Sequence, residues 1–134
     1  MKKINTLLRD LYEINTSSLD DSRGRFTRLF CEQELSAIRP RVHFTQINLS
    51  DTKQKGTLRG LHFQDSPAAE AKLIRCLRGR VFDVAVDIRK NSPTFLQWHG
   101  VELNETNDLA IFIPEGFAHG FQSLSDDVQL LYMH

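Results

Sequence analysis

The sequence predicts an all-β domain, an antiparallel sandwich or barrel of the jelly-roll kind with little helix. Short apolar runs of strand length dominate the second half of the chain at even spacing, and turn-forming residues separate them. One short helix is expected over Glu32–Ile38, where good helix formers are halted by Pro40. Because composition is even throughout, the 134 residues are expected to form a single domain, 1–134.

The expected strands alternate with turn signals such as Arg78-Gly79-Arg80 and Ser125-Asp126-Asp127. Three of them fall in the first half of the chain and six in the second. Their predicted ranges are 25–29, 42–49, 57–62, 72–77, 81–88, 98–103, 109–113, 116–123 and 128–132.

The charge balance argues against partners that are recruited by a net field. Seventeen Lys and Arg residues offset seventeen Asp and Glu residues, so we expect no nucleic-acid partner and no membrane partner. The N-terminus lacks the apolar run of a signal peptide, and no window approaches the ~18 apolar residues of a spanning helix. Cys31 and Cys76 are far apart without metal-ligand spacing, so we expect reduced thiols in a cytoplasmic protein.

Two residues on neighbouring predicted strands attract attention because they are costly on an apolar face. In a regular strand, period two puts His62 and Gly60 on one face and Arg59 on the other. Gly60 indicates a bend or the close approach of a ligand at that point. Lys72 shares a face with Ile74, so its ammonium must reach the rim of the sheet or be paired inside.

The predicted strand 81–88 carries two carboxylates among valines. Its alternation predicts Phe82, Val84 and Val86 on the core face and Asp83 and Asp87 on the opposite face. That opposite face is either solvated or the wall of a cavity. In the second case, a carboxylate such as Asp83 could orient His62 and raise its basicity.

A metal site is not expected, although part of a metal-binding pattern is present. Pro114, Gly116 and His119 match the P-x-G-x-x-H half of the general cupin pattern, whose histidine binds metal in metal cupins. The other half would need a second histidine two residues after His62, and Gln64 stands there. Dispersed imidazoles without a well-placed carboxylate make a poor set of metal ligands.

Planar arginine side chains offer the best means of holding a phosphate. Arg23 and Arg59 present guanidinium forks that suit phosphate oxygens. Neither GxxxxGK[ST] nor a strand-linked GxGxxG occurs, so the usual ATP and dinucleotide loops are absent.

An ordered series of motifs resembles the dTDP-4-dehydrorhamnose 3,5-epimerase family. The resemblance runs from about Asp21 to Tyr132 at nearly the spacing of the family. It implies a cupin-type double-stranded β-helix without metal or other cofactor, usually a homodimer that exchanges N-terminal strands, acting on a nucleoside-diphosphate 4-keto-6-deoxyhexose. The segments that carry it are Asp21-Ser22-Arg23-Gly24, Gln46-Ile47-Asn48, Gly56 to Gln64, Ala71-Lys72-Leu73, Val81 to Arg89, Ser92-Pro93-Thr94, Ile113 to Phe121, and Leu131-Tyr132.

The resemblance also implies three catalytic roles. His62 would be the general base that removes the protons at C3 and C5, and Lys72 would neutralise the enolate oxygen. Tyr132 would return a proton from the opposite face of the ring. These residue types suit the chemistry, because imidazole is an effective base near neutral pH and a preorganised ammonium stabilises developing negative charge.

Substrate-binding roles follow from the same resemblance. Arg23 and Arg59 would bind the diphosphate, Gln46 and Asn48 the polar edges of the nucleotide, His119 the sugar or diphosphate, and Phe26 the base. The family commonly has a glutamate that helps recognise thymine where this sequence has Arg28. A donor in place of an acceptor predicts weakened thymine selectivity.

The resemblance further implies a C-terminal segment with an aspartate that pairs with the catalytic histidine. The sequence stops at His134, so we expect this single domain to lack that segment. Three alternatives stay open: an epimerase acting at C3 alone, a 3,4-ketoisomerase on a related nucleotide sugar, and a sugar-binding cupin without catalytic activity.

Overall fold

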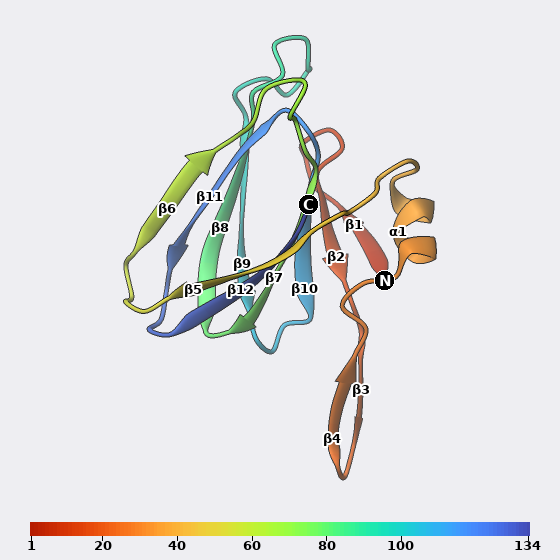
Figure 1. The fold of residues 1–134 in the computed structure, drawn as a ribbon, viewed down its shortest axis with the longest axis vertical. Coiled ribbons are helices and arrows are strands. Elements are labelled where there is room, and N and C mark those ends of the chain that lie inside the picture. The colour runs from red at the N-terminus through yellow and green to blue at the C-terminus, as the bar shows by residue number, and fades with distance from the viewer.

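The computed structural model describes residues 1–134 and shows two antiparallel sheets that face each other, with a hairpin standing apart (Figure 1). One short helix accompanies the strands. The elements are β1 Lys2–Asn5, β2 Tyr12–Asn15, β3 Ser18–Asp21, β4 Gly24–Thr27, α1 Glu32–Ile38, β5 Ile47–Thr52, β6 Leu58–His62, β7 Lys72–Arg78, β8 Arg80–Asp87, β9 Trp98–Asn104, β10 Leu109–Ile113, β11 Phe117–Ser123 and β12 Val128–Met133. The all-β jelly-roll prediction is therefore confirmed.

The larger sheet has six strands in the order β1-β2-β10-β7-β12-β5, and the smaller has four in the order β6-β11-β8-β9. Side chains alternate between the two faces of each strand, so every second residue points into the space between the sheets. Ile74, Phe121 and Leu130 belong to the apolar cluster that fills part of this space. The core thus lies between the sheets, and polar residues on the same strand faces pack against it.

Helix α1 covers the outer face of the six-stranded sheet. Its buried residue Leu35 joins a second apolar cluster with Leu73, Phe112 and Met133, which alternate with the inward-facing residues of their strands. The helix has seven residues, and no helix in the structure has the length and apolarity needed to cross a membrane.

Hairpin β3–β4 projects away from the two sheets and pairs only with itself (Figure 1). A polar cluster anchors its base: Ser18 donates to Asp108, and the buried Arg75 contacts Asp108 at 3.0 Å and also donates to Thr16. The base of the hairpin is therefore fixed to the barrel, whereas its strands stand in solvent.

Eight of the nine expected strands and the helix are confirmed to within a few residues, and the larger differences lie in the first half of the chain. Strands β1 to β3 are absent from the sequence prediction, because β1 and β3 are largely exposed and show no apolar alternation. The expected strand at 42–49 is observed as β5, Ile47–Thr52. Val42 and Phe44 instead pack against the cluster under α1.

The predicted facing of strand β8 is wrong. Asp83 and Asp87 are fully buried and point inward with Val81, whereas Phe82 lies on the outer face and is 38% exposed. The reversal is tolerable because each buried carboxylate has partners: Asp83 contacts His119, and Asp87 accepts hydrogen bonds from Arg89 and two hydroxyls.

Candidate active site

A β-bulge at Gly60 decides which side chains of β6 face inward. Across the pair β6–β11, His62 lies opposite His119 and Arg59 lies opposite Phe121, so β6 uses three steps where β11 uses two. The extra residue reverses the alternation that a regular strand would have. The expectation that His62 and Arg59 occupy opposite faces is therefore wrong, and both share the face that His119 and Phe121 occupy.

Gly60 is suited to this bulge for two reasons. Its φ is +108°, a conformation that side chains with a Cβ disfavour. A Cβ added at Gly60 would also stand 2.6 Å from the His119 carbonyl oxygen and 2.7 Å from Gly120 Cα. The bulge supplies the bend expected at Gly60, and the group that approaches this residue closely is the backbone of β11 and not a ligand.

Several sequence-predicted site residues converge on the inner faces of adjacent strands. His62 on β6 lies opposite His119 on β11, and Asn48 on β5 lies opposite Tyr132 on β12. Directly opposed residues in an antiparallel pair share a face. The Tyr132 ring meets the His119 ring edge-on at 6.0 Å between centroids, which joins the two groups.

Asp83 is the partner of His119, not of His62. Its Oδ2 lies 2.8 Å from His119 Nε2, and both side chains are buried. The suggestion that Asp83 orients His62 is therefore wrong, because the hydrogen bond of Asp83 is made with His119. Its second oxygen, Oδ1, is buried without a hydrogen-bond partner. His62 itself is exposed, and no side-chain hydrogen bond joins it to Asp83.

The environment of Tyr132 keeps its hydroxyl protonated. Burial raises the pKa of this phenol well above its ordinary value of 10.0, and the negative charge of Asp83 raises it further, while Arg59 has the opposite effect. A phenol that stays neutral keeps a proton that it can donate to a substrate, and it is not available as a phenolate base. The arrangement suits a proton donor on the face between the two sheets that carries His62, His119 and Tyr132, which we call the inner wall.

Lys72 opens β7 and faces inward with Ile74 and Cys76, as its predicted strand face requires. Its side chain is only 13% exposed, and its ammonium lies 2.6 Å from Glu70 Oε1. The sequence left two possibilities for this ammonium, reaching the rim of the sheet or forming an ion pair. The structure shows the ion pair.

Arg59 is held along the edge of β5. Its Nε donates to Thr52 Oγ1 at 3.1 Å, and one terminal nitrogen donates to the Asp51 carbonyl at 3.2 Å. Gln46 precedes β5 and exchanges backbone hydrogen bonds with His134. Both Gln46 and Asn48 are exposed at this edge, so their side chains are free to meet a ligand.

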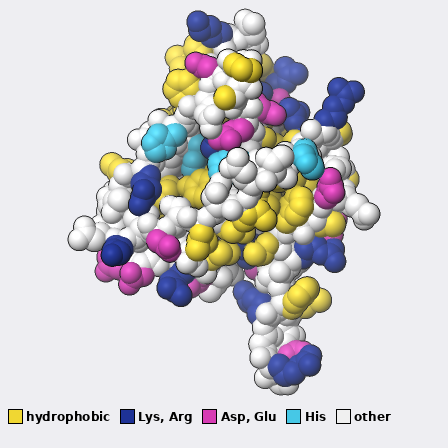
Figure 2. Space-filling view, in the orientation of Figure 1, with side chains coloured by type: hydrophobic (Ala, Val, Ile, Leu, Met, Phe, Trp, Pro, Cys, Tyr) yellow, Lys and Arg dark blue, Asp and Glu magenta, His cyan; other side chains and the backbone are white.

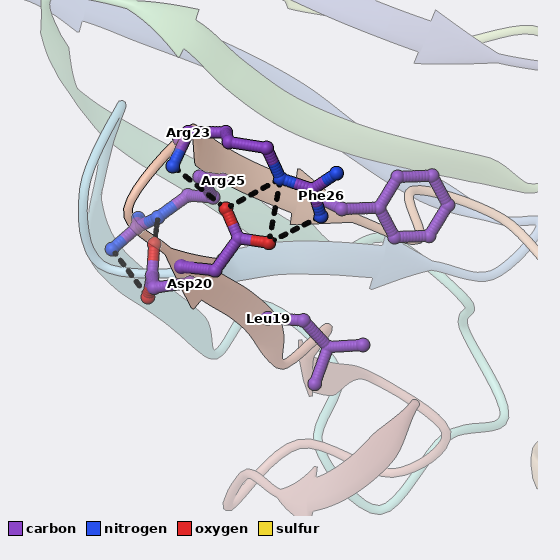
Figure 3. A pocket seen from close by; sticks show the side chains of 7 residues that line it. Leu19, Asp20, Arg23, Arg25 and Phe26 are labelled. Carbon is purple, nitrogen blue, oxygen red and sulfur yellow. Dashed lines mark hydrogen bonds and ion pairs between the residues drawn. The ribbon is translucent and has the colours of Figure 1, made fainter.

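The three remaining predicted residues lie apart from this group, on and just beyond hairpin β3–β4. Arg23 is exposed and pairs with Asp21 at 2.6 Å, and Phe26 is 70% exposed (Figure 3). Arg28 pairs with Glu34 of α1 at 2.5 Å. The structure does not bring these residues to the histidines within one chain.

A shallow hollow of about 490 Å³ lies on the hairpin and is lined by Arg23, Arg25 and Phe26 among others (Figure 3). Figure 2 shows the hairpin clear of the body, with basic and acidic side chains at its tip. The inner wall with its histidines and tyrosine contains the groups for proton transfer, and the hairpin has none of them. Side chains that could transfer protons are therefore found on the inner wall and not on the hairpin.

No three His, Cys, Asp or Glu side chains lie close enough together to hold a metal ion. Gln64, which stands where a metal cupin has its second histidine, donates to Glu70 Oε1 at 2.9 Å. Glu70 was missed by sequence reasoning. Its position two residues before Lys72 was the available signal, because residues i and i+2 of an extended chain share a face.

Comparisons with known proteins agree with this geometry. The sequence profile of the dTDP-4-dehydrorhamnose 3,5-epimerase family matches residues 5–134. A dTDP-4-dehydrorhamnose 3,5-epimerase from Shigella flexneri is 47% identical over 133 residues, which is 98% of this chain and 73% of that protein.

Two solved structures of such epimerases superpose closely. One from Bacillus anthracis, with TDP and PPi bound, has a TM-score of 0.95 at 39% identity and covers 98% of this chain and 75% of that one. One from Legionella pneumophila, in complex with dTDP-4-keto-L-rhamnose, has a TM-score of 0.93 at 44% identity over 98% and 70% of the two chains. The chain described here belongs to the dTDP-4-dehydrorhamnose 3,5-epimerase family.

Proposed function

We propose that this protein is an isomerase that inverts C3 and C5 of a nucleoside-diphosphate 4-keto-6-deoxyhexose. The conversion is dTDP-4-dehydro-6-deoxyglucose to dTDP-4-dehydrorhamnose, a step of deoxysugar supply for cell-surface polysaccharide. The observation that carries the proposal is the bulge at Gly60, which puts His62 opposite His119 on the inner wall. His119 in turn contacts the half-buried ring of Tyr132. Family membership supplies the substrate class.

The mechanism follows from the groups on that wall. The C3 and C5 protons are acidified because both carbons lie α to the C4 ketone. His62 takes one proton, the C–H electron pair moves toward C4, and the ketone oxygen becomes an enolate oxygen. The Lys72 ammonium stabilises that negative charge, an interaction that is stronger in a water-poor cavity than in solution.

Inversion requires that the proton return to the opposite face of the ring. Tyr132 is the donor in this proposal, since its raised pKa keeps the O–H bond intact until the enolate forms. As the phenol proton is delivered to carbon, the enolate collapses back to the ketone. Exchange with water then restores His62 and Tyr132 before the second centre reacts.

Substrate binding is assigned to the groups around this wall. Arg59 is already fixed by Thr52 and Asp51, which suits it to a diphosphate oxygen. His119 would contact the sugar or the diphosphate, and Gln46 and Asn48 the nucleotide. No metal or other cofactor is assigned a role.

The working unit in this proposal is a homodimer. Arg23 and Phe26 are predicted to bind the nucleotide, yet they stand on a hairpin directed away from the histidines of their own chain (Figure 1). A second copy whose hairpin reaches the inner wall would unite them with His62. Cys31 and Cys76 are free thiols, in keeping with a cytoplasmic location.

The decisive test of the function is turnover in deuterated water, followed by NMR of dTDP-4-dehydro-6-deoxyglucose. A 3,5-epimerase incorporates deuterium at C3 and C5 and accumulates the doubly inverted product. Exchange at C3 alone would identify a C3 epimerase, and migration of the ketone to C3 a ketoisomerase. Binding without any exchange would contradict catalysis altogether.

The composite dimer can be tested by co-expressing His62→Ala and Arg23→Ala chains and assaying well below KM. If each site takes His62 from one chain and Arg23 from the other, a mixed dimer has one site in which both residues are intact. Random pairing then restores about a quarter of the wild-type activity. If both residues come from the same chain, every site carries one defect and no recovery appears.

A further inference from the structure

Glu70 is the focus of a polar cluster that the proposed mechanism does not use. Three nitrogen atoms from separate parts of the chain surround its Oε1: Lys72 Nζ at 2.6 Å, Gln64 Nε2 at 2.9 Å and His134 Nδ1 at 3.3 Å. Its side chain is 27% exposed, so the carboxylate sits at the boundary between the protein and solvent. Such convergence on one oxygen fixes the carboxylate in place.

The charge of Glu70 is maintained in this setting. Burial alone favours the neutral acid, but the hydrogen bond and charge of Lys72, together with His134 and Gln64, lower the pKa of Glu70 overall. The carboxylate is therefore ionised at neutral pH and forms a charge-assisted hydrogen bond with the ammonium, a stronger contact than a neutral one.

This contact limits where the Lys72 ammonium can go. A lysine side chain has four flexible carbon–carbon bonds, and an ammonium has three N–H donors. One donor is committed to Glu70, which leaves the others for a ligand. Gln64 holds Glu70 from the neighbouring loop, so the anchor does not depend on Lys72 alone.

The cluster also adjoins the residues assigned to the substrate. The His134 ring stacks on Tyr132 with centroids 5.8 Å apart and planes 3° apart, while its Nδ1 faces Glu70. Glu70, His134 and Gln46 line one hollow of about 270 Å³ at the edge of the barrel. Lys72 and Tyr132, the proposed enolate stabiliser and proton donor, are thus linked through Glu70 and His134.

We propose that Glu70 is a positioning residue for the epimerisation, and that it holds the Lys72 ammonium where the enolate oxygen forms. The inference rests on the proposed role of Lys72. A preorganised cation costs no rearrangement during the reaction, whereas a free lysine must be ordered in each turnover. The negative charge of Glu70 does not itself help the reaction, because it opposes the negative charge of the enolate. What Glu70 contributes is a fixed oxygen that accepts a hydrogen bond from Lys72.

Two substitutions separate the acceptor from the charge. Glu70→Ala removes the anchor and is expected to lower kcat about 10- to 100-fold while KM changes less than about twofold. Glu70→Gln keeps an amide oxygen that can accept from Lys72 and Gln64, and it is expected to retain kcat within about threefold of wild type. Glu115→Ala is the control, since this exposed carboxylate makes no polar contact in the structure.

The closing experiment is a double-mutant cycle of Glu70→Ala and Lys72→Ala, measured as kcat for epimerisation, with thermal unfolding to confirm folding. If Glu70 acts through Lys72, adding Glu70→Ala to Lys72→Ala produces no further loss. Additive losses, or a Glu70→Gln defect as large as that of Glu70→Ala, would overturn the inference. A Lys72→Ala protein with undiminished kcat would instead refute the role of Lys72 in the proposed function.

Discussion

Arginines, aromatic rings and carboxylates occur both on the inner wall of the barrel and on hairpin β3–β4, but the two regions hold them differently. On the inner wall, Asp83 is fully buried against His119, and Arg59 is fixed by Thr52 and Asp51. On the hairpin, Arg23 contacts only Asp21 in its own turn, and Phe26 is 70% exposed.

This difference in how the side chains are held suggests different roles for the two regions, proton transfer for the inner wall and nucleotide binding for the hairpin. In the proposed function, proton transfer takes place on the inner wall, where burial and mutual contact hold Asp83, His119 and Tyr132 in fixed positions. Binding a flexible nucleotide tolerates mobile side chains, which the hairpin provides. Substitutions on the wall should therefore change kcat, and substitutions on the hairpin should change affinity.

After loss of the proposed base His62 itself, the largest effect is expected for Tyr132→Phe, which removes the proposed proton donor and leaves the aromatic ring in place. The rate of inverted product should fall about 10²- to 10⁴-fold, because that is the usual contribution of a positioned acid. Deuterium wash-in at C3 should fall much less, since enolisation uses His62 and Lys72.

The matched control is Tyr12→Phe, whose ring stacks on Phe112 of the six-stranded sheet. It should leave both rates unchanged. Equal losses of exchange and of product in Tyr132→Phe would remove this residue from the acid role.

Gly60→Ala is the next largest change and tests how the wall is built. A Cβ at this position meets the His119 carbonyl at 2.6 Å, and φ is +108°, so the free energy of unfolding should fall by about 2 kcal/mol or more. Urea denaturation provides the measurement.

Gly24 on the hairpin offers a comparison, because its φ is +138° but a Cβ there would meet nothing within 4 Å. Gly24→Ala should therefore lower the free energy of unfolding only through backbone strain, and by clearly less than Gly60→Ala does. Equal losses of unfolding free energy in the two variants would show that the contact with β11 does not constrain the bulge.

The sequence predicted most of the wall but not its geometry. His62, Lys72, His119 and Tyr132 came from motifs, and strand alternation placed Lys72 on its correct face. Alternation failed for Arg59 because it presumes a regular strand, and a bulge is a property of two paired strands. It failed for Asp83 as well, since burial of a carboxylate depends on a partner, here His119, that lies 36 residues away.

The hairpin shows a different limit of sequence reasoning. Arg23, Phe26 and Arg28 were assigned to the nucleotide by resemblance, and β3 was not foreseen because its residues have no core to alternate against. Where the hairpin points is decided at its base, by contacts of Ser18 and Arg75 with Asp108. No local pattern encodes those long-range contacts.

Arg23→Ala should have a moderate effect confined to affinity. Loss of one charge-assisted contact to the diphosphate is expected to raise the Kd for dTDP about tenfold, with kcat at saturation within about threefold of wild type. Isothermal titration and steady-state kinetics measure the two quantities.

Arg25→Ala is the control on the same hairpin, where Arg25 pairs with Asp20 at 2.8 Å. Its Kd should stay within about twofold of wild type. A kcat defect in Arg23→Ala comparable to that of the wall variants would contradict the separation of roles.

The smallest effect is expected in the choice of nucleobase. Arg28 is a donor and cannot accept from thymine N3–H, and its guanidinium is engaged by Glu34. Titrations of dTDP, UDP, CDP and GDP in one buffer should give dissociation constants within about tenfold of one another, because the diphosphate contacts dominate. A strong preference for dTDP would show that Arg28 lies outside the base pocket.

In the proposed function, His62 on the inner wall removes the proton and the hairpin only binds the nucleotide. Deuterium uptake at C3 and C5 under saturating substrate, compared between His62→Ala and Arg23→Ala, separates these two roles. We expect exchange to be abolished in His62→Ala although dTDP still binds, and to persist within about threefold of wild type in Arg23→Ala. Undiminished exchange in His62→Ala would show that another group is the base, and loss of exchange in Arg23→Ala at saturation would show that the hairpin takes part in proton transfer.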